Sequence, residues 1–229
     1  MALDVEQSMS ILNEIFPDQA KKLLGNIVLL NQYEEHMEDW RERQLRHFLE
    51  ITISSVFDLK RAYEERRIST LAWLARNLLE LSVWIQYCNI SESNAKQFSD
   101  DAVRDMFGWA KAIHELTAFQ DGAPDAQLAT RLDNLDKFAA KRGITPLADD
   151  FKRVSDASKE VGNDVLFSKA NKLYSKFAHP TAWVVATANS EEADKEVRGM
   201  IFSDGAELAV VCYLVIRDEF DRMFKRLEE

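Results

Sequence analysis

Residues 69–90, STLAWLARNLLELSVWIQYCNI, form the stretch that decides the fold. Apolar residues recur in it every three or four positions, which is the period of an α-helix. One face is apolar, and further apolar residues extend it around most of the circumference, so this helix is expected to lie in the core of a helical protein. The first face comprises Leu71, Leu74, Leu78, Leu81, Ile85 and Cys88, and the second side adds Leu79, Val83 and Ile90.

The composition of the whole chain also favours helices. Of 229 residues, 46% are hydrophobic, and only 7 are Gly and 4 are Pro. The helical period recurs before and after residues 69–90, whereas the one strand-like stretch, TAWVVATAN, is too short to seed a sheet. The sequence therefore predicts an all-α fold, a single-domain helical bundle over 1–229 with about seven or eight helices. Residues 122–162 are expected to form a peripheral helical hairpin.

Several residues mark expected helix ends. Pro17 is predicted to end a first helix over about 3–16 and to open the next one. Ser69 or Thr70 is predicted to cap the helix that runs to about residue 89. Gly162 marks a stop and a restart, and Pro180 should push His179 out of the helical region of backbone space.

Charge and hydropathy exclude some classes of protein. The formal charge of −10 and the sequence pI of about 5.0 disfavour non-specific binding to nucleic acid. The apolar run from Leu208 to Ile216 is about half of the ~20 residues that span a bilayer. Cys88 and Cys212 lie in apolar helical stretches without metal-site or disulfide spacing. A cytoplasmic, soluble protein is expected.

The helix at 69–90 carries an ionic pair among its apolar residues. At 100° per residue, Arg76 and Glu80 share one face with three aromatic side chains. One interpretation is a buried ion pair that sets the register of neighbouring helices and needs further polar partners. The other is a ligand pocket in which Arg76 holds an anion with two hydrogen bonds. Its walls would be Trp73, Trp84 and Tyr87.

A second polar site is predicted at YSKFAHPTAW, residues 174–183. Lys172, Ser175, Lys176 and His179 share one helix face, and Tyr174 points roughly 140° away from His179. At the end of a helix, His179 can bond the last carbonyl groups, and the helix dipole favours its charged form. It could instead act as a general acid or base, with Lys172 and Lys176 as phosphate contacts. The expected core face of this helix comprises Leu166, Ala170, Leu173 and Phe177.

Motifs for common cofactors do not occur in the sequence. No Glu stands three residues before a His, as it does in di-iron bundles. A zinc-protease motif, a nucleophile elbow, a P-loop and a dinucleotide-binding glycine motif are also missing. No metal or nucleotide cofactor is therefore expected.

Two segments, RNLLELSVWIQY and YSKFAHPTA, resemble the signatures of a family of uncharacterised, mostly bacterial helical proteins. That resemblance implies Arg76, Glu80, Tyr174 and His179 as the site residues, without naming a reaction. More distantly, the pattern is similar to the HEPN group of helical nucleases and toxin-like proteins, which carry an Arg, four to six residues, and a His near a helix end. In this chain Lys172 stands in the place of that Arg.

Three functions remain open on the sequence, and with them the question of whether the protein is an enzyme. The first is a structural or interaction module in which Arg76, Glu80 and His179 form an internal network. The second is a HEPN-like ribonuclease or toxin/defence factor in which His179 transfers a proton. The third is a small-molecule binding module. No partner is identified: a homodimer is compatible with the sequence, no membrane partner is expected, and RNA is expected only for the ribonuclease.

Overall fold

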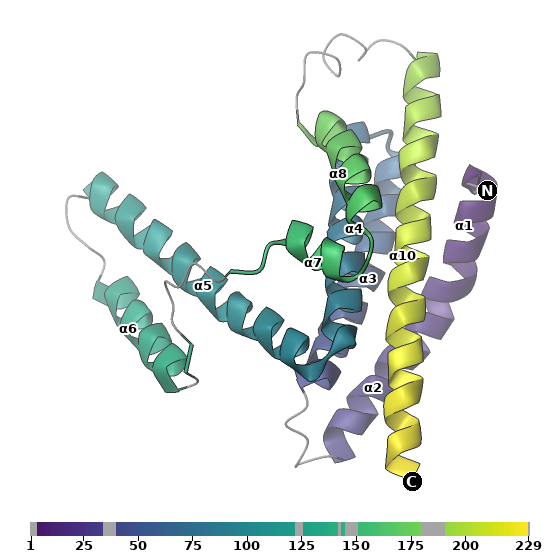
Figure 1. The fold of residues 1–229 in the computed structure, drawn as a ribbon. Coiled ribbons are helices and arrows are strands. Elements are labelled where there is room, and N and C mark those ends of the chain that lie inside the picture. The colour runs from purple at the N-terminus through teal and green to yellow at the C-terminus, as the bar shows by residue number, and fades with distance from the viewer. Residues whose placement is uncertain are drawn as a thin grey trace. The chain divides into compact units, whose positions relative to one another are not determined.

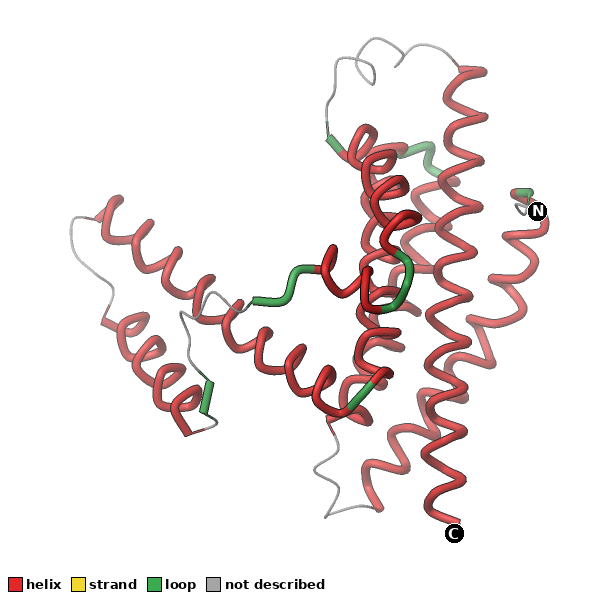
Figure 2. The backbone as a smooth tube through the Cα atoms, viewed as in Figure 1, coloured by secondary structure: helices red, strands yellow, loops and turns green. Residues whose placement is uncertain are grey.

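The protein is all-α. A computed structural model describes residues 4–33, 40–121, 126–141, 143–144, 151–179 and 191–228, and these contain helices and no strand (Figures 1 and 2). The predicted fold class is confirmed. The chain divides into two compact units, where a single domain was expected. Unit 1 comprises Met1–Glu92 and Val154–Glu229, and unit 2 comprises Ser93–Arg153.

Unit 1 begins with one continuous helical rod. Helix α1 (Val5–Glu14) passes through a π-helical turn, η1 (Ile15–Gln19), into α2 (Ala20–Tyr33). The helix break predicted at Pro17 is therefore wrong. Proline lacks an N–H and its ring collides with the carbonyl four residues earlier. The wider π turn, closed by the Ala20 N–H on the Ile15 carbonyl, accommodates proline without ending the rod.

Three long helices form the centre of unit 1. These are α3 (Trp40–Glu64), α4 (Ile68–Ile90) and α10 (Glu191–Glu228), and α10 runs alongside both α3 and α4 (Figure 1). Helix α4 contributes the stretch that decided the fold, and eleven of its residues are buried. Ile90 is an exception to the predicted apolar face, because it is exposed at the last turn.

The start of α4 differs from the prediction. Its N-cap is Arg67, and no side chain caps the helix, so Ser69 and Thr70 lie inside the first turn. The reason is the sharp end of α3. Arg66 takes a positive φ of 58°, and the Arg67 N–H bonds the Ala62 carbonyl, which reverses the chain one residue before α4 begins.

Two shorter helices, α7 (Val154–Glu160) and α8 (Asp164–Ala178), lie on the α4 side of unit 1. Gly162 separates them with a φ of 75°, and the Asn163 N–H bonds the Ser158 carbonyl, so the predicted stop and restart is confirmed. Helix α8 ends at His179, whose extended ψ of 151° is the conformation that a following proline imposes. The strand-like residues 181–189 lie outside the described part of the chain.

Unit 2 is a helical hairpin of α5 (Glu92–Asp121) and α6 (Ala126–Lys141). It differs in extent from the peripheral hairpin predicted at 122–162, because the long α5 supplies one arm and α7 belongs to unit 1. Val103, Ala139 and Ile144 form its buried cluster. Counting α1, η1 and α2 as one rod, the described residues contain eight helical segments, in agreement with the predicted number.

Helix α10 is also apolar enough to be compared with a membrane span. Between Asp194 and Lys225 it holds an 18-residue window with a mean hydropathy of 1.7. A core helix of a globular protein satisfies the same criterion, and 56% of this window is buried inside the structure. Its apolar residues are accounted for in large part by packing against α3 and α4.

Candidate functional site

Tyr174 and Asp204 join α8 to α10. The Tyr174 hydroxyl donates a hydrogen bond to Asp204 Oδ2 over 3.2 Å, and the tyrosine side chain is only 2% exposed. Helix α8 presents Phe167, Tyr174 and Phe177 to the core, whereas Leu166 is exposed. The predicted core face was therefore wrong at Leu166, because α8 is rotated so that its aromatic residues pack inward.

Two further contacts place Tyr174 and Asp204 at the level of Arg76 on α4. The Asn163 amide donates to Gln86 Oε1 over 3.2 Å, which fixes the start of α8 beside Gln86. Tyr174 is 11 residues after Asn163, and Ala75 is 11 residues before Gln86. A Cβ built on Gly205 would lie 3.5 Å from the Ala75 Cβ. Helices α4 and α8 are thus antiparallel. Arg76, Glu80, Tyr174, Asp204 and Glu207, hereafter the polar layer, lie near one level of unit 1.

The polar layer changes the acidity of two of its members. Burial, and then the negative charges of Asp204 and Glu207, raise the pKa of the Tyr174 hydroxyl far above its ordinary value. Burial also raises the pKa of Asp204, while the hydrogen bond from Tyr174 lowers it and Glu207 raises it. Tyr174 therefore stays protonated at neutral pH, where it can donate a hydrogen bond but cannot act as a base.

Arg76 and Glu80 form the predicted ion pair. Arg76 Nε lies 3.1 Å from Glu80 Oε1, and the two side chains are 32% and 30% exposed. The pair is therefore not sealed in the core, and water can satisfy the atoms that a buried pair would have left without partners. Within the described residues no ion pair joins Arg76 to Asp204, so the Arg76–Glu80 pair and the Tyr174–Asp204 bond are separate contacts.

The three aromatic residues predicted to line a pocket on α4 have different surroundings. Tyr87 is buried and meets Trp84 edge to face, with ring centroids 5.8 Å apart. Trp73, one turn before Arg76, is more than half exposed. Tyr87 is thus packed as a core residue, and Trp73 offers an open surface beside the Arg76–Glu80 pair.

His179 does not reach the Arg76–Glu80 pair. Its side chain is exposed at the end of α8 and makes no hydrogen bond or ion pair with any described residue. Lys172 and Lys176 are exposed on the same face, and Lys169 extends that face by one turn. Lys169, Lys172, Lys176 and His179, hereafter the α8 basic face, lie opposite Tyr174. The structure therefore divides the predicted site residues into a buried group and a surface group.

No family model, curated protein or solved structure matches this chain. Its function must therefore be inferred from its own residues, and the resemblance of its two motif segments stays a prediction.

The buried nucleophilic groups are inert. Cys88 and Cys212 are buried and form no disulfide within the described residues, and burial raises the pKa of the Cys212 thiol to about 12. The Cys212 thiol lies 3.9 Å from the Leu78 carbonyl, inside the contact between α4 and α10. In the part of the chain that the structure describes, no three His, Cys, Asp or Glu side chains are grouped to hold a metal ion.

Three polar residues of unit 1 were missed by sequence reasoning. Asp204 and Glu207 interrupt the apolar run of α10 one turn apart, which is a signal that the sequence contains. Arg198 is buried, and its guanidinium group donates a hydrogen bond to the Tyr63 carbonyl over 2.9 Å and stacks over the Tyr63 ring. Its Nε lies 3.3 Å from Asp194 Oδ2. The sequence does not reveal that Arg198 stabilises the fold, because the carbonyl that it binds is a backbone group at the end of another helix.

Proposed function

We propose that this chain is a helical interaction module, with the polar layer holding its helices in register and the α8 basic face meeting an acidic partner protein. The observation that carries the proposal is the division of the motif residues. Tyr174 is buried and bonded to Asp204, whereas His179, Lys172 and Lys176 are exposed on the other side of the same helix. One side of α8 supports the fold, and the other is available to a partner.

The chemistry of the α8 surface favours a protein partner. Lys169, Lys172 and Lys176 stand out in a chain with a formal charge of −10. Val165 and Leu166, both largely exposed, lie one turn before Lys169 and extend the basic surface with apolar side chains. Cations next to exposed aliphatic groups suit an acidic amphipathic helix, which offers carboxylates and apolar side chains together.

The polar layer supports the same interpretation. A catalytic acid or base must reach its substrate, whereas the Tyr174 hydroxyl is enclosed and bonded to Asp204. Asp204 has a raised pKa, which is common at catalytic sites, but burial and the neighbouring Glu207 are structural causes that suffice. We infer that the polar layer sets the register of α8 against α10.

The test measures binding by fluorescence anisotropy to a labelled acidic peptide with Leu at helical spacing, and to a single-stranded RNA of similar charge. We expect the peptide to bind and the double variant K172E/K176E to weaken it at least about tenfold. The control is Lys22→Glu, which reverses the charge of an exposed lysine on α2. Equal binding by the wild type and K172E/K176E, or no binding of the peptide, contradicts the proposal.

A HEPN-like ribonuclease is the second candidate, because His179 is exposed at the end of the face that carries Lys172 and Lys176. His179 would transfer the proton of a ribose hydroxyl, and the two lysines would hold the phosphate. This function requires cleavage of the RNA by the wild type and loss of that cleavage in His179→Ala. Lys172→Arg should then retain or increase activity, because Arg binds phosphate with two parallel hydrogen bonds.

A further inference from the structure

Several large apolar side chains of unit 2 are exposed, although the unit is a small hairpin. Met106 is 55% exposed and Trp109 is 63% exposed on α5, and Phe138 is about half exposed on α6. The buried cluster of Val103, Ala139 and Ile144 is too small to account for these residues. Exposed apolar patches of this kind mark interaction surfaces.

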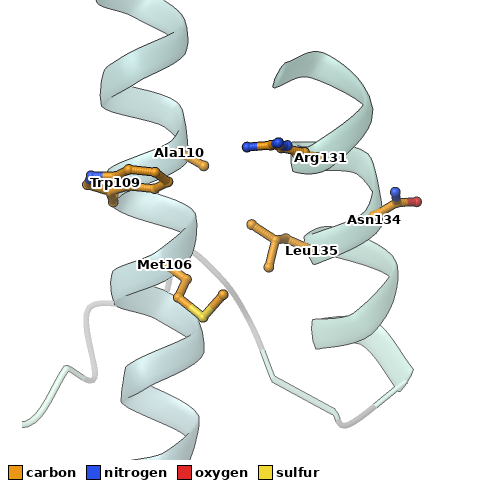
Figure 3. Close-up of a pocket in the computed structure, with 6 residues that line it drawn as sticks. All are labelled: Met106, Trp109, Ala110, Arg131, Asn134 and Leu135. Carbon is orange, nitrogen blue, oxygen red and sulfur yellow. The ribbon is translucent and has the colours of Figure 1, made fainter. Parts of the chain in front are cut away.

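Met106 and Trp109 line a groove between α5 and α6 with a volume of about 370 Å³ (Figure 3). Met106 and Leu135 point into the space between the helices, and Arg131 extends across it toward Ala110. The groove is mainly apolar and has one cationic side chain at its edge. Met106, Trp109, Ala110, Arg131, Asn134 and Leu135 line it and are hereafter called the α5–α6 face.

The α5–α6 face contains one cation, Arg131, and an anion, Asp105, lies beside it. Several other charged residues of the hairpin are paired within their own helix, as in Lys111 with Glu115 and Lys137 with Asp133. Among the described residues, neither Arg131 on α6 nor Asp105 on α5 has such a partner. Asp105 lies one turn before Trp109 and therefore flanks the apolar centre. Partial burial and the charge of Asp101 raise its pKa.

The overall charge singles out the same unit. Residues 93–153 contain nine Lys and Arg and ten Asp and Glu, so unit 2 has a net charge of −1, whereas the chain has −10. The remaining charge of −9 belongs to unit 1. Repulsion between these charges would keep the unit 1 surfaces of two copies apart. Unit 2 is where two copies can approach with the least electrostatic cost.

We propose that the α5–α6 face binds the same face of a second copy of this chain, with twofold symmetry. In such an interface each contact occurs twice, so a surface with one free cation and one free anion is complementary to itself. Trp109 enters the groove of the second copy, and Arg131 pairs with Asp105 of the second copy. The two helices present roughly 700 Å² by their length and width, close to the ~800 Å² per partner of a stable complex.

The decisive experiment uses sedimentation equilibrium of the full chain between about 1 and 100 µM, the range in which a micromolar dimer dissociates. The wild type should dimerise, and D105R and R131D should each weaken dimerisation at least about tenfold, because each brings like charges together twice. Mixing D105R with R131D should restore a dimer of the two variants. The double variant D105R/R131D should again dimerise with itself.

Trp109→Glu tests the apolar centre, and Trp73→Glu is its matched control, since Trp73 is an equally exposed tryptophan on α4 of unit 1. We expect only Trp109→Glu to give a monomer, with unchanged helical circular dichroism. A monomeric wild type, or a dimer that none of these variants weakens, overturns the proposal. Acrylamide quenching gives a further test, in which the Trp109 signal is the fluorescence that Trp109→Phe removes. If acrylamide fails to quench this signal in the monomer, the α5–α6 face is covered by its own chain and the proposal is overturned.

Discussion

The Tyr174 hydroxyl on α8 donates a hydrogen bond to the Asp204 carboxylate on α10 over 3.2 Å. The donor is buried, and the acceptor is a half-buried carboxylate whose pKa is raised by burial and by Glu207. This bond fixes the position of a motif tyrosine against a residue 30 positions later in the chain. It also turns the other side of α8, with His179 and its lysines, toward solvent.

Tyr174→Phe should lower the free energy of unfolding by about 1 kcal/mol, because it removes one hydrogen bond while keeping the aromatic packing. Urea denaturation followed by circular dichroism measures the change. Tyr213→Phe is the control, since the Tyr213 ring is also buried but its hydroxyl makes no hydrogen bond within the described residues. A loss as large in Tyr213→Phe would show that the hydroxyl–carboxylate bond is not the cause.

Asp204→Asn should increase stability at pH 7, and the gain should shrink as the pH falls through the raised folded pKa toward the unfolded value of about 4. The raised pKa means that the folded state binds the Asp204 proton more tightly than the unfolded state does. The stabilising effect of that proton is present below the unfolded pKa and is lost as the pH rises through the folded pKa. The neutral amide avoids this loss and can still accept the bond from Tyr174.

Denaturation midpoints of the wild type and Asp204→Asn across pH 3.5 to 7.5 test this dependence. Asp221→Asn, at an exposed carboxylate of the same helix, provides the control and should show no comparable trend. A destabilised Asp204→Asn at neutral pH would mean that the charge of Asp204 is needed, which points to a bound cation or to catalysis.

Glu80→Gln should cost no more than about 0.5 kcal/mol, because the Arg76–Glu80 pair is partly exposed and has its cation on the N-terminal side, the weaker orientation. Thermal unfolding of the wild type and Glu80→Gln in low salt and in 1 M salt measures the loss of stability. The small difference in stability between the two proteins should vanish at high salt. A loss several times larger would indicate a partner for Glu80 that solvent cannot replace.

Arg198→Ala should lower the free energy of unfolding by about 2 to 3 kcal/mol, because it leaves the Tyr63 carbonyl without its charged donor and removes a buried side chain. Arg198→Lys should recover only part of the loss, since an ammonium group cannot stack and bond as a guanidinium does. Arg217→Ala, at an exposed arginine paired with its neighbour Asp218, should change stability little.

Gly25→Ala and Gly205→Ala should have opposite consequences, although both glycines lie within helices. At Gly25 a Cβ meets nothing within 4 Å, so alanine should add about 0.5 to 1 kcal/mol. At Gly205 it would lie 3.0 Å from a methyl of the buried Leu59, which requires that tightly packed side chain to shift. Stability measurements in which Gly205→Ala gains as much as Gly25→Ala would exclude close packing there.

Local rules predicted some of these features well. Proline at 180 restricts the backbone of His179, glycine at 162 allows the turn between α7 and α8, and Arg76 and Glu80 are paired by helix geometry alone. The same rules misplaced the helix break at Pro17, because the energetic cost of proline can be met by a π turn that packing keeps in place. Local rules pointed to Arg76, Glu80, Tyr174 and His179, but they did not predict which of these residues are buried or which residues they contact.

The sequence by itself determined that the protein is helical, which residues could pair along one helix, and where α8 ends, because these depend on neighbours within about one turn. Only the tertiary structure decided that Tyr174 is buried against Asp204, that Arg76 and Glu80 remain open to water, and that His179 stands apart from them. The rotation of α8 that buries Tyr174 and exposes His179 depends on how its large side chains pack against α4 and on the bond to Asp204 of α10. That packing joins residues far apart in the sequence, and no local pattern records it.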